Sequence, residues 1–181
     1  MKLSGFFRRD RHDEAAHSLY FAVVTQARRD EFYTQAGVPD TVDGRFDMVA
    51  LHAYLILRRL GREGKRAGAL SQAVFDIMFA DMDQNLREIG VGDLSVGKKV
   101  KAMAQAFYGR IAAYNVGLDG DDRQLGDALR RNLYRKTAPD EDQVAAMAAY
   151  LRRQATALDG QPFDALMAGK VSFAGLGSPP Q

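Results

Sequence analysis

One stretch, residues 37–61, constrains the fold of this chain more than any other, because it combines clear boundaries with a largely apolar interior. Gly37, Pro39 and Gly44 are turn-forming residues at its start, and the ring of Pro39 disfavours helical conformation in the residue before it. An earlier helix is therefore expected to end before Pro39, and a new helix to begin after it. Gly61, which follows a basic pair, is expected to end that new helix.

The helix expected within this stretch is apolar on nearly every side. Thr41 or Asp43 can cap its amino end with a side-chain oxygen. From Phe46 onward most positions up to Leu60 are apolar, although His52 interrupts the run. The run is shorter than the roughly 20 residues that a bilayer span needs, so we expect the central helix of a folded domain.

A helix that is apolar on all sides is either buried on several sides or offers one side to a partner. Burial in the core is the simpler interpretation. The alternative is a client-binding face made by Met48, Leu51, Tyr54 and Leu55, together with Met82 from the next predicted helix.

The rest of the chain shows the apolar spacing of amphipathic helices and lacks the alternation typical of strands. The spacing predicts helices over residues 13–35, with a possible break near 28–31, and over 69–89, 96–115, 122–135 and 140–158. The fold class that follows is all-α, a single compact domain of about six helices. We expect a basic N-terminal arm over residues 1–14, the helical domain over 15–160, and a partly disordered, Gly- and Pro-containing tail over 161–181.

Turn and cap residues define the ends of several predicted helices. Gly90 and Gly92 are expected to close one helix, and Asp93 or Ser95 to cap the next, which Gly117 should end. The residues to which we assign a structural rather than a binding role are Gly37, Pro39, Gly44, Arg45, Phe46, Asp83, Arg87, Gly90 and Gly92.

Composition limits the possible compartments and functions. The chain has 181 residues, 46% of them apolar, which is enough for one domain with a core. It contains no cysteine, which excludes disulfides and thiol catalysis and is consistent with a reducing compartment. The N-terminal apolar run is too short for the core of a secretory signal. We therefore expect a cytoplasmic location, with peripheral contact at the inner membrane as an open alternative.

Basic residues are numerous but spread out. The net charge is only +2, so no global field attracts nucleic acid, and we expect no DNA binding. The densest basic cluster contains Arg58, Arg59, Arg62, Lys65 and Arg66. Such a cluster is either a solvated surface or a contact for lipid phosphates, ribosomal RNA or an acidic partner. An RNA- or ribosome-binding helical module, using this cluster with those at 98–101 and 130–136, is therefore the alternative to a client-binding function.

No pattern in the chain supports catalysis, so we expect a protein that is not an enzyme and has no metal or other cofactor. Residues 92–99 have the spacing of a phosphate-binding loop, but Lys99 stands where Ser or Thr must ligate magnesium, and no strand precedes. His12 and His17 fall on different sides of a helix. His52 is isolated in an apolar run, which is typical of a hydrogen-bonded core histidine.

Four short elements carry a more specific signal. They are Gly37-Val38-Pro39-Asp40, Asp43-Gly44-Arg45-Phe46, Met82-Asp83 with Leu86-Arg87-Glu88, and Gly90 through Lys98. They lie in the segments FYTQAGVPDTVDGRFDMVALHAYLILRRL and VFDIMFADMDQNLREIGVGDLSVGKKVKAMAQAFYGRIAAY. Together they resemble the ubiquinol–cytochrome c chaperone family, over about residues 15–155.

The resemblance implies a helical domain that binds newly made cytochrome b and holds it until haem insertion and assembly into respiratory complex III. It also implies contacts that other members make, with a small partner chaperone and with the ribosome near its exit tunnel. An apolar groove rimmed by charge would suit such a client, because it offers apolar contact while keeping the protein soluble.

Overall fold

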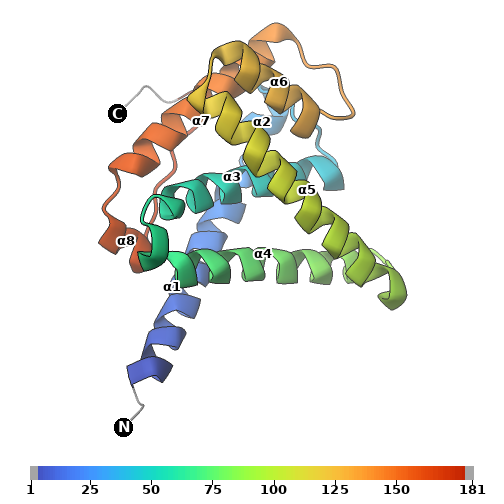
Figure 1. Cartoon of the computed structure of the whole chain (residues 1–181). Coiled ribbons are helices and arrows are strands. Elements are labelled where there is room, and N and C mark those ends of the chain that lie inside the picture. Colours follow the sequence, from blue (N-terminus) through green and yellow to red (C-terminus); the bar gives the residue numbers. More distant parts are fainter. Residues whose placement is uncertain (1–3, 178–181) are drawn as a thin grey trace.

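A computed structural model of the chain describes residues 4–177, and their side chains from residue 12 onward. Within that range every regular element is a helix, which confirms the expected all-α fold (Figure 1). The helices are α1 (Ser4–Ala27), α2 (Glu31–Thr34), α3 (Val42–Gly61), α4 (Gly68–Glu88), α5 (Asp93–Asp119), α6 (Asp122–Asn132), α7 (Glu141–Gly160) and α8 (Phe163–Met167), with a short 3-10 turn, η1 (Gly64–Arg66). No helix in this described part combines the length and the apolar character that a membrane crossing needs.

Helix α3 lies at the centre of the arrangement. Helices α1, α4 and α7 pack on it, while the long α5 runs from α6 to the far end of α4 (Figure 1). The seven consecutive residues 50–56 are all buried, which covers every side of the helix over almost two turns. Three polar side chains, Asp47, His52 and Arg59, are buried with them.

The start of α3 follows the sequence prediction. Thr41 is the N-cap, and its hydroxyl oxygen accepts a hydrogen bond from the Gly44 backbone nitrogen at 3.1 Å. A side chain at Gly44 would collide with the carbonyl oxygen of Pro39, so the absence of one lets the preceding turn fold back on the helix. Gly61 is the last residue of α3, as expected.

Two expected helix ends differ from the structure. Gly92, rather than Asp93 or Ser95, is the N-cap of α5, and no side chain caps it. Gly117 does not end α5 but lies inside it, where a Cβ atom would come within 2.8 Å of the Leu125 Cα atom. This glycine therefore serves the close approach of α5 and α6 and not a turn.

The two ends of the described chain differ: the first turns of α1 extend away from the other helices, whereas the segment after α7 lies along them (Figure 1). Helix α1 begins at Ser4, so the expected arm over residues 1–14 is largely the first part of a helix; residues 1–3 lie outside the described range. After α7 the chain forms α8 and then packs along the body, with Leu166 and Leu176 buried. Disorder was expected at the extreme end, and residues 178–181 lie outside the described residues.

We predict opposite effects for alanine at two glycines of α3. Gly44→Ala should destabilise the fold by about 2 kcal/mol, because the new methyl group overlaps the Pro39 carbonyl. Gly61→Ala should leave stability unchanged or raise it by up to about 1 kcal/mol, because a Cβ there meets nothing within 4 Å. Urea unfolding of both variants tests this, and equal effects would show that the Gly44 contact does not constrain the turn.

Candidate functional site

The five side chains expected to form a client-binding face are buried. Met48 and Leu51 are 0% exposed, Tyr54 and Leu55 are 1% exposed, and Met82 is 4% exposed. They pack in the single large cluster of apolar side chains that fills the domain. The four residues of α3 therefore offer almost no surface to a client in this structure, whereas Met82 of α4 lines the open groove described below.

His52 is held by a buried hydrogen-bond network. Its Nδ1 lies 2.8 Å from the Met48 carbonyl oxygen and its Nε2 lies 2.7 Å from the Tyr150 hydroxyl. Because a carbonyl can only accept, Nδ1 carries the proton and Nε2 accepts from Tyr150. Complete burial lowers the pKa of His52 to about 4, so the ring is neutral at pH 7. Both nitrogens are occupied, which confirms the interpretation of a core histidine.

The same network extends to the C-terminal segment. The Gln26 amide donates to the Tyr150 hydroxyl at 2.9 Å and to the Ala174 carbonyl at 2.8 Å. Gln154 also donates to the Ala174 carbonyl, at 3.1 Å, and accepts from the Ala174 backbone nitrogen. Helices α1, α3 and α7 and the segment after α8 are thus joined by one set of buried polar groups.

Asp47 forms a second buried polar cluster. Its carboxylate is 2.6 Å from Arg110 of α5 and 2.8 Å from Arg135, which follows α6. Burial raises the pKa of Asp47 above its ordinary value, and the two guanidinium groups oppose that rise. Asp47 is 3% exposed, so the cluster cannot meet a ligand; it fixes α5 and the α6–α7 connection onto α3.

The basic cluster from Arg58 to Arg66 is mostly used inside the fold. Arg58 donates to Asn115 at 2.9 Å and pairs with Asp119 at 2.8 Å. Arg59 is buried and donates to the backbone carbonyls of Leu158 and Gln161, at 3.0 and 3.1 Å.

Two of the other three members of that cluster also contact groups of the protein itself. Arg62 pairs with Asp159 at 2.8 Å, and Arg66 lies 4.8 Å from the centre of the Phe163 ring and 3.4 Å from Glu63. Among its five members only Lys65 has no polar partner in the described part of the chain. The cluster is therefore chiefly a set of helix-to-helix contacts, which weakens the expectation that it binds phosphates.

The residues given a structural role behave as helix ends and turns. Gly37 and Gly90 have φ values of 65° and 88°, which other residues rarely adopt. Arg87 pairs with Asp83 at 2.5 Å in the expected i, i+4 geometry and also with Asp93 across the turn between α4 and α5. Arg45, in the first turns of α3, pairs at 2.6 Å with Asp40, which precedes that helix.

An open groove lies where α1, α3, α4 and α5 meet, with a volume of about 280 Å³. Its apolar lining comes from all four helices: Val24, Val42, Phe46, Val49, Met82, Leu86, Ile89 and Met103. Val42 and Ile89 are 66% and 60% exposed at its rim. Arg28, Arg45 and Asp81 add charge, and Asp81 accepts a hydrogen bond from Tyr20 at 2.7 Å.

Sequence reasoning identified only part of this groove. Met82 was predicted to touch a client and lines the groove floor, and Phe46 and Arg45 were assigned a structural role. Ile89 was predicted only as the last apolar position of the helix over residues 69–89, and Val42, which stands between polar residues, was not predicted to bind anything. Their place at helix ends was the available signal.

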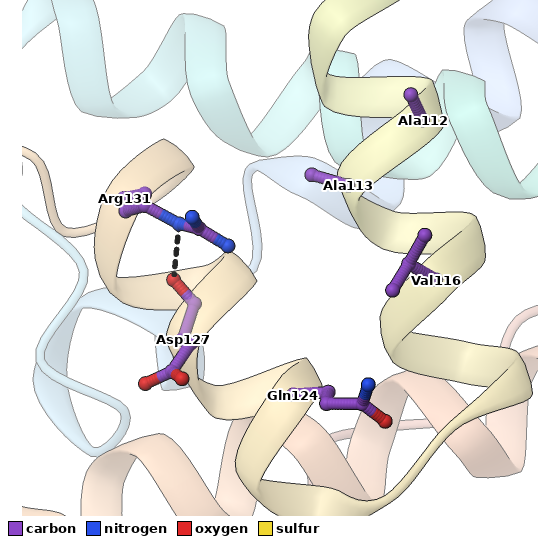
Figure 2. Close-up of a pocket in the computed structure, with 6 residues that line it drawn as sticks. All are labelled: Ala112, Ala113, Val116, Gln124, Asp127 and Arg131. Atoms are coloured by element: carbon purple, nitrogen blue, oxygen red, sulfur yellow. Dashed lines mark hydrogen bonds between the residues drawn. The ribbon is translucent and has the colours of Figure 1, made fainter.

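A second, shallower depression lies between α5 and α6. Figure 2 shows Ala112, Ala113 and Val116 on α5 facing three polar residues of α6. Arg131 donates to the Asp127 backbone carbonyl at 3.2 Å, and Gln124 serves the capping box of α6 with Asp121. These polar groups are thus used by their own helix, and the depression brings no nucleophile and base together.

The remaining sequence motif has no binding geometry. Residues 93–99, in the phosphate-loop-like spacing, form the first turns of α5 instead of a loop after a strand. Within the residues whose side chains are described, no group of three acidic or histidine side chains could hold a metal ion.

Comparison with known proteins identifies the family. The family model described as ubiquinol-cytochrome C chaperone matches residues 34–173. The chain belongs to this family. The match ends at residue 173, so it includes α8 and part of the segment that follows it.

Individual relatives agree with this assignment. Ubiquinol-cytochrome-c reductase complex assembly factor 1 of Xenopus laevis is 30% identical over 90% of this chain and 82% of its own length. The Homo sapiens protein of the same name is 29% identical, and the chain covers 54% of it. The crystal structure of the Cbp3 homolog from Brucella abortus superposes with a TM-score of 0.85 at 36% identity, covering 97% of this chain and 98% of that one.

We predict that His52 makes this chaperone-family domain less stable in acid. The unfolded chain takes up a proton near pH 6.5, whereas the folded domain resists protonation until about pH 4. The stabilising contribution is therefore present above pH 6.5 and lost as the pH falls to about 4, amounting to about 3 kcal/mol. Urea unfolding across this range should show a smaller pH dependence in His52→Gln than in the wild type. His17→Gln, at an exposed position, should keep the wild-type dependence; identical slopes in all three proteins would contradict the assignment.

We also predict that Asp47→Ala destabilises the domain by about 3–5 kcal/mol, because it leaves the buried Arg110 without its carboxylate. Asp43→Ala removes the partner of Lys136 at an exposed position and should cost under about 1 kcal/mol. Chemical denaturation of the two variants provides the comparison. A small effect of Asp47→Ala would mean that Arg110 finds water or another partner.

Proposed function

We propose that this protein is a non-enzymatic chaperone for the assembly of ubiquinol–cytochrome c reductase, respiratory complex III, and that its client is newly synthesised cytochrome b. The family match over residues 34–173 is the observation that carries the proposal. Relatives that match along 90% of this chain are named assembly factors of that complex. A buried His52 and two pockets without paired catalytic groups agree with a binding function.

The groove between α1, α3, α4 and α5 is the proposed client site. It offers accessible apolar atoms at Val42 and Ile89, whereas the apolar residues in the middle of α3, from Ala50 to Ile56, are buried. Four residues from the elements that carry the family resemblance line it: Arg45, Phe46, Met82 and Leu86. This coincidence of family-specific elements with accessible apolar surface favours the groove over other faces.

The size and charge of the groove define what it holds. A volume of about 280 Å³ is at the lower end for ligand pockets, so it accommodates a few side chains of the client and not a whole helix. Met82 and Met103 supply adaptable apolar contacts. Arg28 and Arg45 at the edge suit a membrane-protein segment that ends in polar or acidic residues.

The RNA- or ribosome-binding alternative receives less support. Four of the five basic residues from Arg58 to Arg66 are bound to groups of the protein itself. A partner chaperone and ribosome contact remain part of the proposal only through the family resemblance, as does a location at the inner membrane.

The groove is tested by Val42→Asp in a strain whose only copy carries the variant. Val42 is the first residue of α3, where a negative charge suits the helix dipole, so the fold should be retained. The charge in the groove should lower client binding about tenfold or more and reduce complex III. Photo-crosslinks from residue 42 should reach cytochrome b in the unsubstituted background.

Phe21→Asp is the matched control, because Phe21 is 74% exposed on α1 and does not line the groove. It should leave complex III unchanged. Equal effects of the two variants would argue against the groove, and normal complex III in a strain lacking the protein would refute the chaperone function itself.

A further inference from the structure

The turn between α4 and α5 presents apolar side chains to solvent. Leu94 is 101% exposed and Ile89 is 60% exposed, and almost all residues from 87 to 95 are exposed. Figure 1 shows this turn projecting from the body at the far end of α4. Large apolar side chains placed on a projecting turn gain nothing from the core and are costly to keep in water.

The projecting turn is a well-formed structure. The backbone nitrogens of Ile89, Gly90 and Val91 donate to carbonyls of the last turn of α4, at 3.1, 3.0 and 3.0 Å. The positive φ of Gly90 allows this closure. Arg87 ties the end of α4 to Asp93 at the start of α5. The exposure of Leu94 therefore belongs to the folded state.

The charges around the turn are unequally neutralised. Asp83 and Asp93 are both paired with Arg87, and Glu88 accepts a hydrogen bond from Gln84 at 2.8 Å. Three lysines follow on α5: Lys98, Lys99 and Lys101. All three are exposed, and within the described part of the chain none has a carboxylate partner. From Asp83 to Lys101 the four cationic side chains, Arg87 and the three lysines, exceed the three carboxylates by one, and the three lysines are the cations without a carboxylate partner.

Helical spacing places these features on one face. Lys98 and Lys101 stand four and seven residues after Leu94, so they share its side of α5 and lie about 6 and 10 Å further along the axis. A surface that met Leu94 with apolar atoms would meet the two lysines with anionic groups just outside. This order, apolar and then anionic, is that of a lipid monolayer seen from its interior toward water.

We propose that the α4–α5 turn docks this protein on anionic membrane surfaces, with Leu94 and Ile89 entering the headgroup region and Lys98, Lys99 and Lys101 contacting lipid phosphates. The shape favours lipid over a protein partner, because the tip is convex and offers no groove of its own. RNA would use the lysines but leave Leu94 without a role. The proposal shares Ile89 with the rim of the client groove, whereas Leu94 and the three lysines do not line that groove, so the tests below use only Leu94 and the lysines.

Vesicle binding of the full chain tests the proposal. The protein should bind vesicles of phosphatidylcholine mixed with phosphatidylglycerol, bind pure phosphatidylcholine weakly, and lose binding as salt rises. Reversing Lys98, Lys99 and Lys101 to Glu should lower affinity for the mixed vesicles about tenfold or more. Lys65, Arg123 and Lys170, all exposed and outside the turn, provide a control with the same change of net charge and should have little effect when reversed to Glu.

A fluorescent probe tests insertion separately. The chain has no cysteine, so Leu94→Cys gives a single labelling site for a polarity-sensitive dye. Its emission should shift to the blue on mixed vesicles, whereas the same dye at Phe21→Cys should not respond. The proposal is overturned if the mixed vesicles are not bound, if both charge-reversed variants bind alike, or if the two dye positions respond equally. Salt-sensitive binding to RNA that is lost with Lys98, Lys99 and Lys101, without vesicle binding, would instead assign the lysines to nucleic acid.

Discussion

The burial of the middle of α3 on all sides is the constraint on which the rest of the structure depends. A helix in that position cannot leave any polar side chain unpaired, because water does not reach it. Each buried polar residue of α3 has its partner on another element. Asp47 is bound by Arg110 and Arg135, His52 by Tyr150, and Arg59 by the backbone carbonyls of Leu158 and Gln161 at the end of α7.

These partners make the domain cooperative over most of its length. The bonds from α3 reach residues 57 to 102 positions later in the chain, so the central helix is satisfied only when α5, α7 and the segment after α7 have packed. The Ala174 carbonyl, held by Gln26 and Gln154, closes the same network from the C-terminal side. This physical coupling accounts for a family match that continues to residue 173, beyond the last long helix.

Much of the fold was predictable from local sequence, and the proposed client groove was not. Thr41 and Gly61 marked the ends of α3 because capping and helix termination depend on neighbouring residues. The prediction that Gly117 ends α5 was wrong, because sequence alone does not distinguish a glycine that ends a helix from one that lets another helix approach closely. Likewise, Arg58 and Arg59 looked like a free basic patch, since their partners Asn115, Asp119 and Leu158 are distant in sequence.

The contrast between Leu51 and Val42 shows where a helical chaperone of this size can place its binding surface. Leu51 lies in the most apolar stretch of the chain, and that same property draws it into the core. Among the described residues, the exposed large apolar side chains lie partly inside helices, at Phe21 of α1 and at Tyr108 and Val116 of α5, and partly at the start of α3 and at the turn between α4 and α5. Val42, Ile89 and Leu94 occupy the latter positions and are exposed. In such a fold the strongest apolar periodicity identifies the core, and apolar residues beside helix-ending glycines or caps are the better guide to contacts with a client or a lipid surface.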